Sequence, residues 1–392
     1  MKNIYLDNNA TTPILPEAIF AVENMLENFG NPSSMHEAGR IVKEKIEEAT
    51  DNIAEFFGAN KEDIVFTSCA TESNNTILKS VLFNDYNFTP HIIVSNIEHP
   101  SILETARFLV KRGIEVTFLP VRKDGLIHPD DLEESIKENT VLISIMTANN
   151  EIGTIQPINE LGKIAKSKGI FFHTDAVQAA GMMEINLQNW NIDAASFSAH
   201  KMYAPKGIGL LYIKDFKNNR KKFTPLLHGG HQEEGFRAGT ENTLGIVSFG
   251  AAAEYFRKNL DKEIDHLKNL RDSFENMIKK EISDILIHAE NSPRKPNTSN
   301  VSFKYIEGES ILLGLDLEGI KVSTGSACST GSLDPSHVIT AINDDIEAAH
   351  GSIRFSFGRT NEMSDIKYVI EKLKHIVNNL REMSPLVRSQ NN

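Results

Sequence analysis

Residues 170–178 read I-F-F-H-T-D-A-V-Q, and residues 194–201 read A-A-S-F-S-A-H-K. In both stretches a short run of β-prone residues ends in side chains that carry carboxyl, amide, imidazole or amine groups. In an α/β sheet, ligands bind at the carboxyl ends of the strands. The two stretches therefore predict neighbouring strands whose ends form part of a binding site.

Similar runs alternate with segments of helical periodicity over the first two thirds of the chain, which predicts an α/β fold with a mostly parallel sheet covered by helices. We expect a large domain over residues 16–255. From about residue 256 the pattern changes to a charged helix at 262–281, short strands and a closing helix at 363–382. This pattern predicts a smaller α+β domain, formed by residues 1–15 and 256–392. The remaining predicted strands of the large domain lie at 64–67, 91–95, 141–146 and 209–213.

Composition excludes several classes of protein. The chain has 392 residues, with 53 acidic against 41 basic side chains and a net charge of −12. This charge opposes binding to nucleic acid and to anionic membranes, so small molecules and proteins are the expected partners. The amino-terminal residues lack an apolar signal core, and no window approaches the ~18 apolar residues of a membrane span. We therefore expect a soluble, cytoplasmic protein.

The chain has only two cysteines, Cys69 and Cys328. Two are too few for a disulfide framework or a four-cysteine zinc site. Cys69 follows a predicted strand, where a small residue packs well against a helix. Cys328 lies in S-T-G-S-A-C-S-T-G-S at 323–332, whose small residues predict a flexible loop that can carry a thiol between positions. His228 and His231 in H-G-G-H lack a third ligand at suitable spacing, so no metal site is predicted.

Four strand ends together carry what pyridoxal phosphate requires. Lys201 offers an amine for a Schiff base, and Asp175 offers a carboxylate for the protonated ring nitrogen. His99 offers a flat ring, and Thr71 opens a helix whose free amides suit a phosphate. Each residue alone has an ordinary alternative, namely a solvated lysine, a helix cap, a core histidine and a turn residue. Their occurrence at successive strand ends favours the cofactor site.

The sequence resembles the cysteine desulfurases of the NifS/IscS type, which are fold-type I pyridoxal phosphate enzymes related to the class V aminotransferases. The resemblance runs nearly from end to end. It is carried by Y-L-D-N-N-A-T-T-P at 5–13, F-G-N-P-S-S at 29–34, T-S-C-A-T-E-S-N-N at 67–75, E-H-P at 98–100, A-N-N-E-I-G at 148–153, H-T-D-A-V-Q at 173–178, S-F-S-A-H-K at 196–201, A-P-K-G-I-G at 204–209, R-A-G-T-E-N at 237–242, S-T-G-S-A-C at 323–328 and I-R-F-S-F-G-R at 353–359. The N-N pair at 8–9 and R-A-G-T-E-N resemble the NifS branch in particular.

The resemblance implies roles for individual residues. Lys201 would hold pyridoxal 5'-phosphate as a Schiff base and move the Cα proton, and His99 would stack on the ring and act in acid/base steps. Asp175 would pair with the ring nitrogen, and Gln178 would hydrogen-bond the phenolic oxygen. The phosphate would be contacted by Ala70, Thr71, Ser198, His200 and, from the second subunit of a homodimer, Thr240.

The substrate implied by the resemblance is L-cysteine. Asn150, which also lies beside the cofactor, and Arg354 would bind its carboxylate, because a guanidinium can donate two parallel hydrogen bonds. Arg354 could instead form an ordinary strand salt bridge, and Arg359 is the rival candidate. The Cys328 thiolate would attack the substrate sulfur, leave alanine and become a persulfide. An iron-sulfur scaffold or another acceptor protein would then take the sulfur.

Three alternatives remain open at this stage. A selenocysteine lyase or an aminotransferase could use the same fold, although a transaminase has no use for Cys328. A non-catalytic interaction protein could also keep the fold, but loss of Lys201 or Asp175 would be expected in that case, and both are present.

Overall fold

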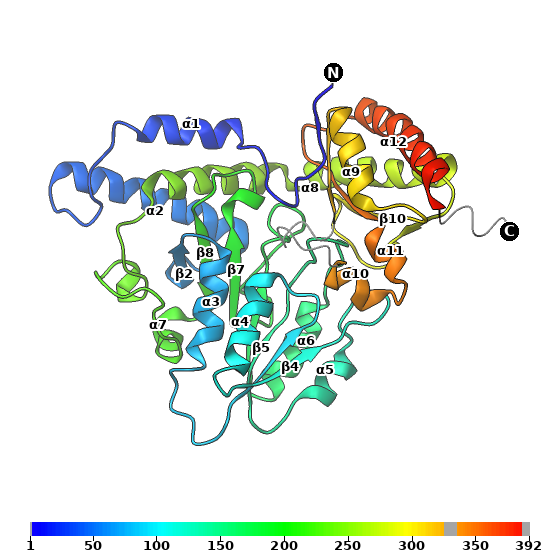
Figure 1. Ribbon diagram of the computed structural model, residues 1–392. Coiled ribbons are helices and arrows are strands. Elements are labelled where there is room, and N and C mark those ends of the chain that lie inside the picture. The colour runs from blue at the N-terminus through cyan, green and yellow to red at the C-terminus, as the bar shows by residue number, and fades with distance from the viewer. Residues whose placement is uncertain (1, 325–334, 386–392) are drawn as a thin grey trace.

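A computed structural model of the chain describes residues 2–324 and 335–385. At its centre lies a seven-stranded sheet (Figure 1). Strand β8 is antiparallel to both of its neighbours, and the other pairs are parallel, which confirms the predicted α/β fold. The strands are, in spatial order, β2 (Ile64–Thr67), β8 (Gly209–Ile213), β7 (Ala194–Ser198), β6 (Phe171–Asp175), β5 (Thr140–Ser144), β3 (His91–Ser95) and β4 (Glu115–Leu119).

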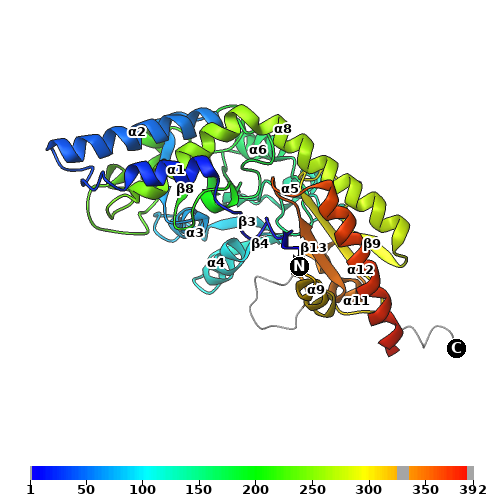
Figure 2. The ribbon, with the colours of Figure 1, turned by 90° about the horizontal axis from the view of Figure 1, so that it is seen from above.

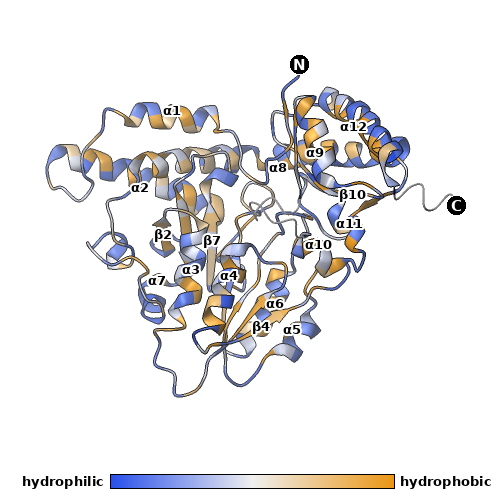
Figure 3. Cartoon of the chain, in the orientation of Figure 1, coloured by the Kyte–Doolittle hydropathy of each residue, from blue (hydrophilic) through white to orange (hydrophobic). Residues whose placement is uncertain are grey.

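Helices cover both faces of this sheet, so four of its seven strands are buried along their whole length. All residues of β2, β3, β7 and β8 are buried, which explains their nearly continuous apolar sequences. Figure 3 shows the strands of the sheet as largely hydrophobic and the helices as mixed. The helices of this part are α1 (Pro16–Met25), α2 (Glu37–Phe57), α3 (Ala70–Ser80), α4 (Pro100–Val110), α5 (Pro129–Ser135), α6 (Ile158–Ser167) and α7 (Phe216–Asn219).

A single long helix, α8 (Thr243–Glu281), links the two parts of the molecule (Figure 2). Its first half packs closely on α2, where a Cβ added at Gly250 would lie 2.6 Å from the Cα of Ala49. Phe256 is the last buried apolar residue of α8 in the core of the large part, and Leu267 is the first in the core of the small part. The predicted boundary at 255/256 thus falls inside a continuous helix, and the division into two domains stays a prediction.

The smaller part contains a four-stranded antiparallel sheet and a two-stranded parallel pair. The pair joins β1 (Ile4–Tyr5) to β11 (Ile320–Lys321), so the amino-terminal segment packs with the carboxyl-terminal third of the chain. Three residues of α10 instead belong to the core of the large part, namely Val338, Ile339 and Ile342. The other elements are β9 (Ile285–Ile287), β10 (Thr298–Phe303), α9 (Gly308–Leu317), β12 (Ser323–Thr324), α10 (His337–Ile342), α11 (Ile346–His350), β13 (Ser352–Ser356) and α12 (Met363–Met383).

The structure differs from the predicted elements in several places, and the strand expected at 141–146 lies at Thr140–Ser144. Strand β4 was not predicted, because an edge strand with an exposed face has a weaker apolar signal. The charged helix expected at 262–281 begins at Thr243. Ile19, Val22, Leu26 and Phe29 recur with a helical period that predicts a helix. Helix α1 ends at Met25, and Ile19, Leu26 and Phe29 are exposed. Among the described residues, no helix combines the length and the apolar character needed to cross a membrane.

Candidate active site

The strand ends of the large sheet open into a cavity of about 310 Å³ at the side of the smaller part. Three larger hollows, of about 330, 660 and 740 Å³, lie elsewhere and contain none of the residues predicted for the site. The cavity brings together side chains from seven separate segments of the chain. It is lined by Asn9, Ala10, Cys69, Ala70, Thr71, His99, Ser101, Met146, Asn150, Asp175, Val177, Gln178, Ser198, His200, Lys201 and Arg354.

Asp175, the last residue of β6, is a buried carboxylate in the cavity wall. Its Oδ2 accepts a hydrogen bond from the Nδ2 of Asn74 at 2.8 Å, and its Oδ1 accepts one from the backbone N–H of Val177 at 3.1 Å. Asn74 also donates to the Oγ of Ser101 at 2.9 Å. The amide of Asn74 thus links Asp175 to Ser101 and holds the carboxylate in place, a role that the sequence did not reveal.

Lys201 lies directly after β7, at the end of the short 3₁₀ turn Ala199–Lys201. Its Nζ donates hydrogen bonds to the backbone carbonyl oxygens of Asn9 and Ala10, each at 2.6 Å. The amino-terminal segment therefore holds the amine against the cavity wall.

His99 is the N-cap residue of α4, and its Nδ1 accepts a hydrogen bond from the backbone N–H of Ser101 at 3.1 Å. Since that nitrogen accepts, the proton of the neutral ring lies on Nε2. Burial lowers the pKa of His99, and the positive charge of Lys201 lowers it further, while Asp175 acts in the opposite direction. The ring is thus neutral at neutral pH.

The start of α3 forms the anion-binding end of the cavity. Cys69 is the N-cap residue, but its side chain makes no capping hydrogen bond, so the first amides of the helix are left for another acceptor. Thr71, Ser198 and His200 lie in the same wall. Burial lowers the pKa of His200 to about 4, aided by Lys201 and Lys206, so this ring is a neutral partner.

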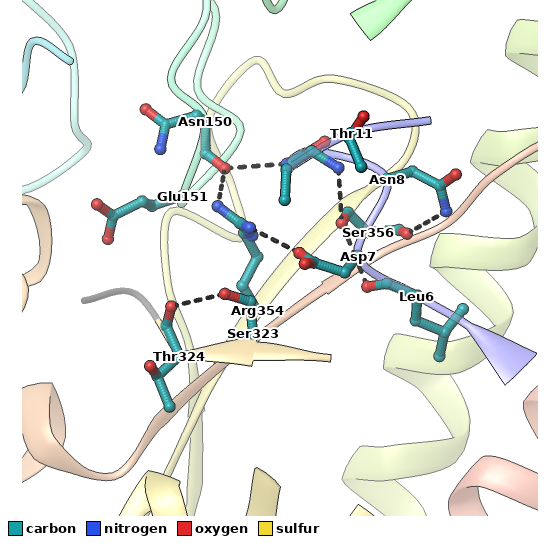
Figure 4. Close-up of polar contacts among 12 residues, drawn as sticks. Leu6, Asp7, Asn8, Thr11, Asn150, Glu151, Ser323, Thr324, Arg354 and Ser356 are labelled. Carbon is teal, nitrogen blue, oxygen red and sulfur yellow. Dashed lines mark hydrogen bonds and ion pairs between the residues drawn. The ribbon is translucent and has the colours of Figure 1, made fainter. Parts of the chain in front are cut away.

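Arg354, in the middle of β13, is buried and projects toward the amino-terminal segment (Figure 4). Its Nη2 donates to the Oδ1 of Asp7 at 2.8 Å, and its Nη1 donates to the backbone oxygen of Asn150 at 3.1 Å. Its Nε is buried and has no hydrogen-bond partner among the described residues. Arg354 thus forms the salt bridge that was considered for it and also lines the cavity.

Arg359, the rival candidate, lies outside the cavity wall. Its side chain donates to the hydroxyl of Tyr255 at 2.8 Å and lies 3.4 Å from the Oε1 of Glu263. Of the two arginines, only Arg354 is placed to meet a ligand in the cavity.

Two predicted residues are not in this wall. Thr240 is exposed, in the segment that precedes α8, which is compatible with a role in the site of another subunit. Cys328 lies outside the described residues, as does most of its loop. Cys69 is only partly buried and lines the cavity, instead of being fully buried as expected. The remaining predicted site residues all line the cavity.

The described residues fit pyridoxal phosphate. A buried carboxylate from Asp175, the amine of Lys201 and the uncapped start of α3 face one cavity. These are the groups that ring nitrogen, aldehyde and phosphate require.

Comparison with known proteins agrees with this geometry. Residues 4–369 match the aminotransferase class-V family. The chain is 51% identical over 385 residues to a cysteine desulfurase IscS of Dictyoglomus turgidum, which covers 98% of this chain and 97% of that protein. It is 48% identical over 387 residues to one from Methanosarcina thermophila, covering 98% and 94%.

Solved structures give the same result. A NifS-like protein superposes with a TM-score of 0.88 at 36% identity, covering 97% of this chain and all of that one. The structure described as SspA in complex with cysteine superposes with a TM-score of 0.80 at 35% identity, and the match covers 91% of this chain and 99% of that one. The chain belongs to the aminotransferase class-V family. The family prediction is confirmed, while the relatives' names include both IscS and NifS-like and so favour neither branch.

Proposed function

We propose that the chain is a cysteine desulfurase that transfers the sulfur of L-cysteine to Cys328. The Cβ–S bond of the substrate breaks and an S–S bond forms, so one L-cysteine and one thiol give one L-alanine and one persulfide. The single observation that carries this proposal is the convergence of Lys201, Asp175, His99 and Arg354 on one cavity. Curated relatives named cysteine desulfurase, at 45–51% identity over nearly the whole chain, support the activity.

Pyridoxal phosphate, when bound, supplies an electron sink that makes the substrate Cα–H acidic and its Cβ–S bond breakable. In our assignment Asp175 holds the ring nitrogen protonated, and Asn74 and Val177 keep that carboxylate in place. Ala70, Thr71, Ser198 and His200 hold the phosphate at the start of α3, and Gln178 donates to the phenolic oxygen.

Lys201 would hold the cofactor through Nζ, and its amine would take the proton from the substrate Cα. The carbonyl oxygens of Asn9 and Ala10 hold this amine on one side of the cavity. His99 would stack on the ring, and its Nε2–H would donate a hydrogen bond to groups there that carry negative charge. Because burial lowers its pKa, the resting ring is neutral and would have to take up a proton before it could act as an acid.

Arg354 and Asn150 bind the substrate carboxylate. The contacts of Arg354 with Asp7 and with the backbone of Asn150 fix the guanidinium plane before substrate arrives. A preformed guanidinium costs less ordering on binding than a free side chain. The carboxylate contact orients Cβ and sulfur toward the approaching thiol of Cys328.

The functional unit is a homodimer in which Thr240 reaches the phosphate of the partner. Large apolar side chains are exposed around α1 and the start of α2, with Phe20 and Leu26 63% and 62% exposed and Phe29 and Met35 both 91% exposed. An apolar surface of this kind marks an interaction site, and a second copy is the partner we assign to it. The persulfide then passes to an iron-sulfur scaffold or another acceptor protein in the cytoplasm.

The test is a pair of cysteine variants in the holoenzyme. Cys328→Ser should abolish alanine and persulfide formation from L-cysteine while the protein keeps its bound, absorbing cofactor. Cys69→Ala is the cysteine control, because alanine adds no capping group to the start of α3 and Cys69 is assigned no part in the reaction; it should keep turnover. Full turnover by Cys328→Ser would refute the nucleophile. Amino transfer to a keto acid, or a strong preference for selenocysteine, would favour the alternative enzymes.

A further inference from the structure

A lysine of the smaller part is buried beside the cavity and has no part in the proposed mechanism. Lys295 precedes β10 and is 1% exposed, although lysine is almost never fully buried without a partner. Among the described residues, no carboxylate lies within ion-pair distance of its Nζ. Its burial therefore needs another explanation.

The polar partners of Lys295 are two side-chain amides. Its Nζ donates to the Oδ1 of Asn9 at 2.9 Å and, by a shorter contact, to the Oε1 of Gln178. Burial lowers the pKa of Lys295 well below its usual value, and the charges of Lys201 and Arg354 add to this effect. Both partners are amide oxygens, so Lys295 is the hydrogen-bond donor in each contact.

These contacts decide which way the Gln178 amide points. Lys295 donates to its oxygen, while the backbone oxygen of Asn9 accepts from its Nε2 at 3.0 Å. If the amide turned over, its NH₂ would face the Lys295 donor and its oxygen would face the Asn9 carbonyl, so both contacts would become repulsive. With the amide as it stands, Nε2 keeps a second N–H beyond the one given to Asn9. Gln178 lines the cavity, so this N–H is available to a ligand there.

We propose that Lys295 is a positioning residue, which holds the Gln178 amide so that its NH₂ group faces the cavity and stabilises the ionised phenolic oxygen of the bound cofactor. The inference rests on the proposed function, because it assumes the contact between Gln178 and that oxygen. The other charged groups that face this corner are Lys201, Arg354 and, behind Arg354, Asp7.

The test is the pH titration of the absorption band of the bound cofactor. Lys295→Met keeps the length of the side chain but removes the donor, so the midpoint should rise by about one pH unit, a tenfold change in the ionisation constant. Lys295→Gln keeps a donor on a shorter chain and should give a smaller rise. A midpoint equal to that of the wild type in the Lys295→Met holoenzyme would overturn the inference. If Lys295→Met does not fold, the same result in Lys295→Gln would overturn it.

Arg271 offers a matched control for damage to the fold. Its Nη1 donates to the backbone oxygen of Lys295 at 2.7 Å, so it holds the same segment without contacting Gln178. Arg271→Met should lower the melting temperature and leave the titration midpoint unchanged. A wild-type holoenzyme that forms no alanine would instead contradict the proposed function, and this outcome is distinct from an unshifted midpoint in an active enzyme.

Discussion

Arg354 and Asp7 are 347 positions apart in sequence, yet the Nη2 of Arg354 lies 2.8 Å from the Oδ1 of Asp7. The guanidinium that we assign to the substrate carboxylate is therefore fixed by the amino-terminal segment. The side chain of Arg354 is 4% exposed and that of Asp7 is 22% exposed, so water screens this pair less than it would a surface pair. The binding group is thus oriented before any ligand enters.

Arg354→Lys should raise the KM for L-cysteine at least tenfold. An ammonium offers a single point charge where the guanidinium offers two parallel hydrogen bonds, and one charge-assisted hydrogen bond contributes about 1.5–3 kcal/mol. Initial rates over a range of L-cysteine concentrations give the KM. The matched control is Arg359→Lys, whose side chain contacts Tyr255 and Glu263 away from the cavity and whose KM should stay within about twofold. A larger change in the control would reverse the choice between the two arginines.

Lys201→Ala should lower the rate of alanine formation at least a thousandfold, because this one residue both binds the cofactor covalently and moves the proton. The loss should appear in kcat, measured with the variant saturated with pyridoxal phosphate. Lys206→Ala is the control, since Lys206 is an exposed lysine five residues away that does not line the cavity. Normal turnover by Lys201→Ala would remove the proposed base.

His173 should make the fold less stable in acid. Its ring lies in the sheet, with Nδ1 2.8 Å from the Oγ of Ser144 and Nε2 2.9 Å from the Oγ of Ser196, and burial lowers its pKa to about 3. The unfolded chain takes up the proton near pH 6.5, whereas the folded chain does not until about pH 3. Stability therefore falls as the pH decreases between these values, by roughly 1.4 kcal/mol per pH unit for this one group.

Urea unfolding between pH 6 and pH 4 measures that dependence. His173→Gln should lower the stability at neutral pH and flatten the slope by up to one proton, since glutamine does not titrate. The slope should remain unchanged in His375→Gln, because His375 is exposed on α12. An equal slope in the His173→Gln variant would show that the buried ring does not cause the acid sensitivity.

Mixed dimers test the position of Thr240. Thr240→Ala should weaken cofactor binding in a homodimer, and Lys201→Ala should be inactive. When the two variants are mixed and allowed to exchange subunits, one site of each mixed dimer contains both Lys201 and the partner's Thr240. At limiting cofactor, about a quarter of the wild-type activity should then return. No gain above the sum of the separate variants would place Thr240 outside the neighbouring site.

Much of the fold and of the cavity could be predicted from local sequence. The runs at 64–67, 91–95, 194–198 and 209–213 coincide with strands, because short apolar stretches bounded by polar turns have few other solutions. Asp175 is the last residue of β6, and Lys201 lies three residues after the end of β7. Knowing where the strands end was therefore enough to predict that these two residues meet.

The contacts that orient those residues could not be predicted in this way. Asn74, Asn9 and Lys295 act through hydrogen bonds whose partners depend on side-chain direction and on segments far apart in the chain. The period of α1 predicted a helix correctly, but an apolar stripe does not say whether it faces a core or another subunit. In the structure Phe20 on α1 is exposed, so this side of the helix does not pack against the core of the same chain.

Asn9 is synthesised long before two of its hydrogen-bond partners in the smaller part. It leaves the ribosome 286 residues before Lys295 and 347 before Ser356, although it bonds to both in the finished protein. At about 5–20 residues per second, the ribosome adds Lys295 roughly 15–60 seconds after Asn9. Lys201 and Gln178 can be synthesised and the large sheet can close in that time, but the wall that holds them is completed only near the end of synthesis. Cofactor capture should therefore be a late event, after the growing polypeptide has nearly been released.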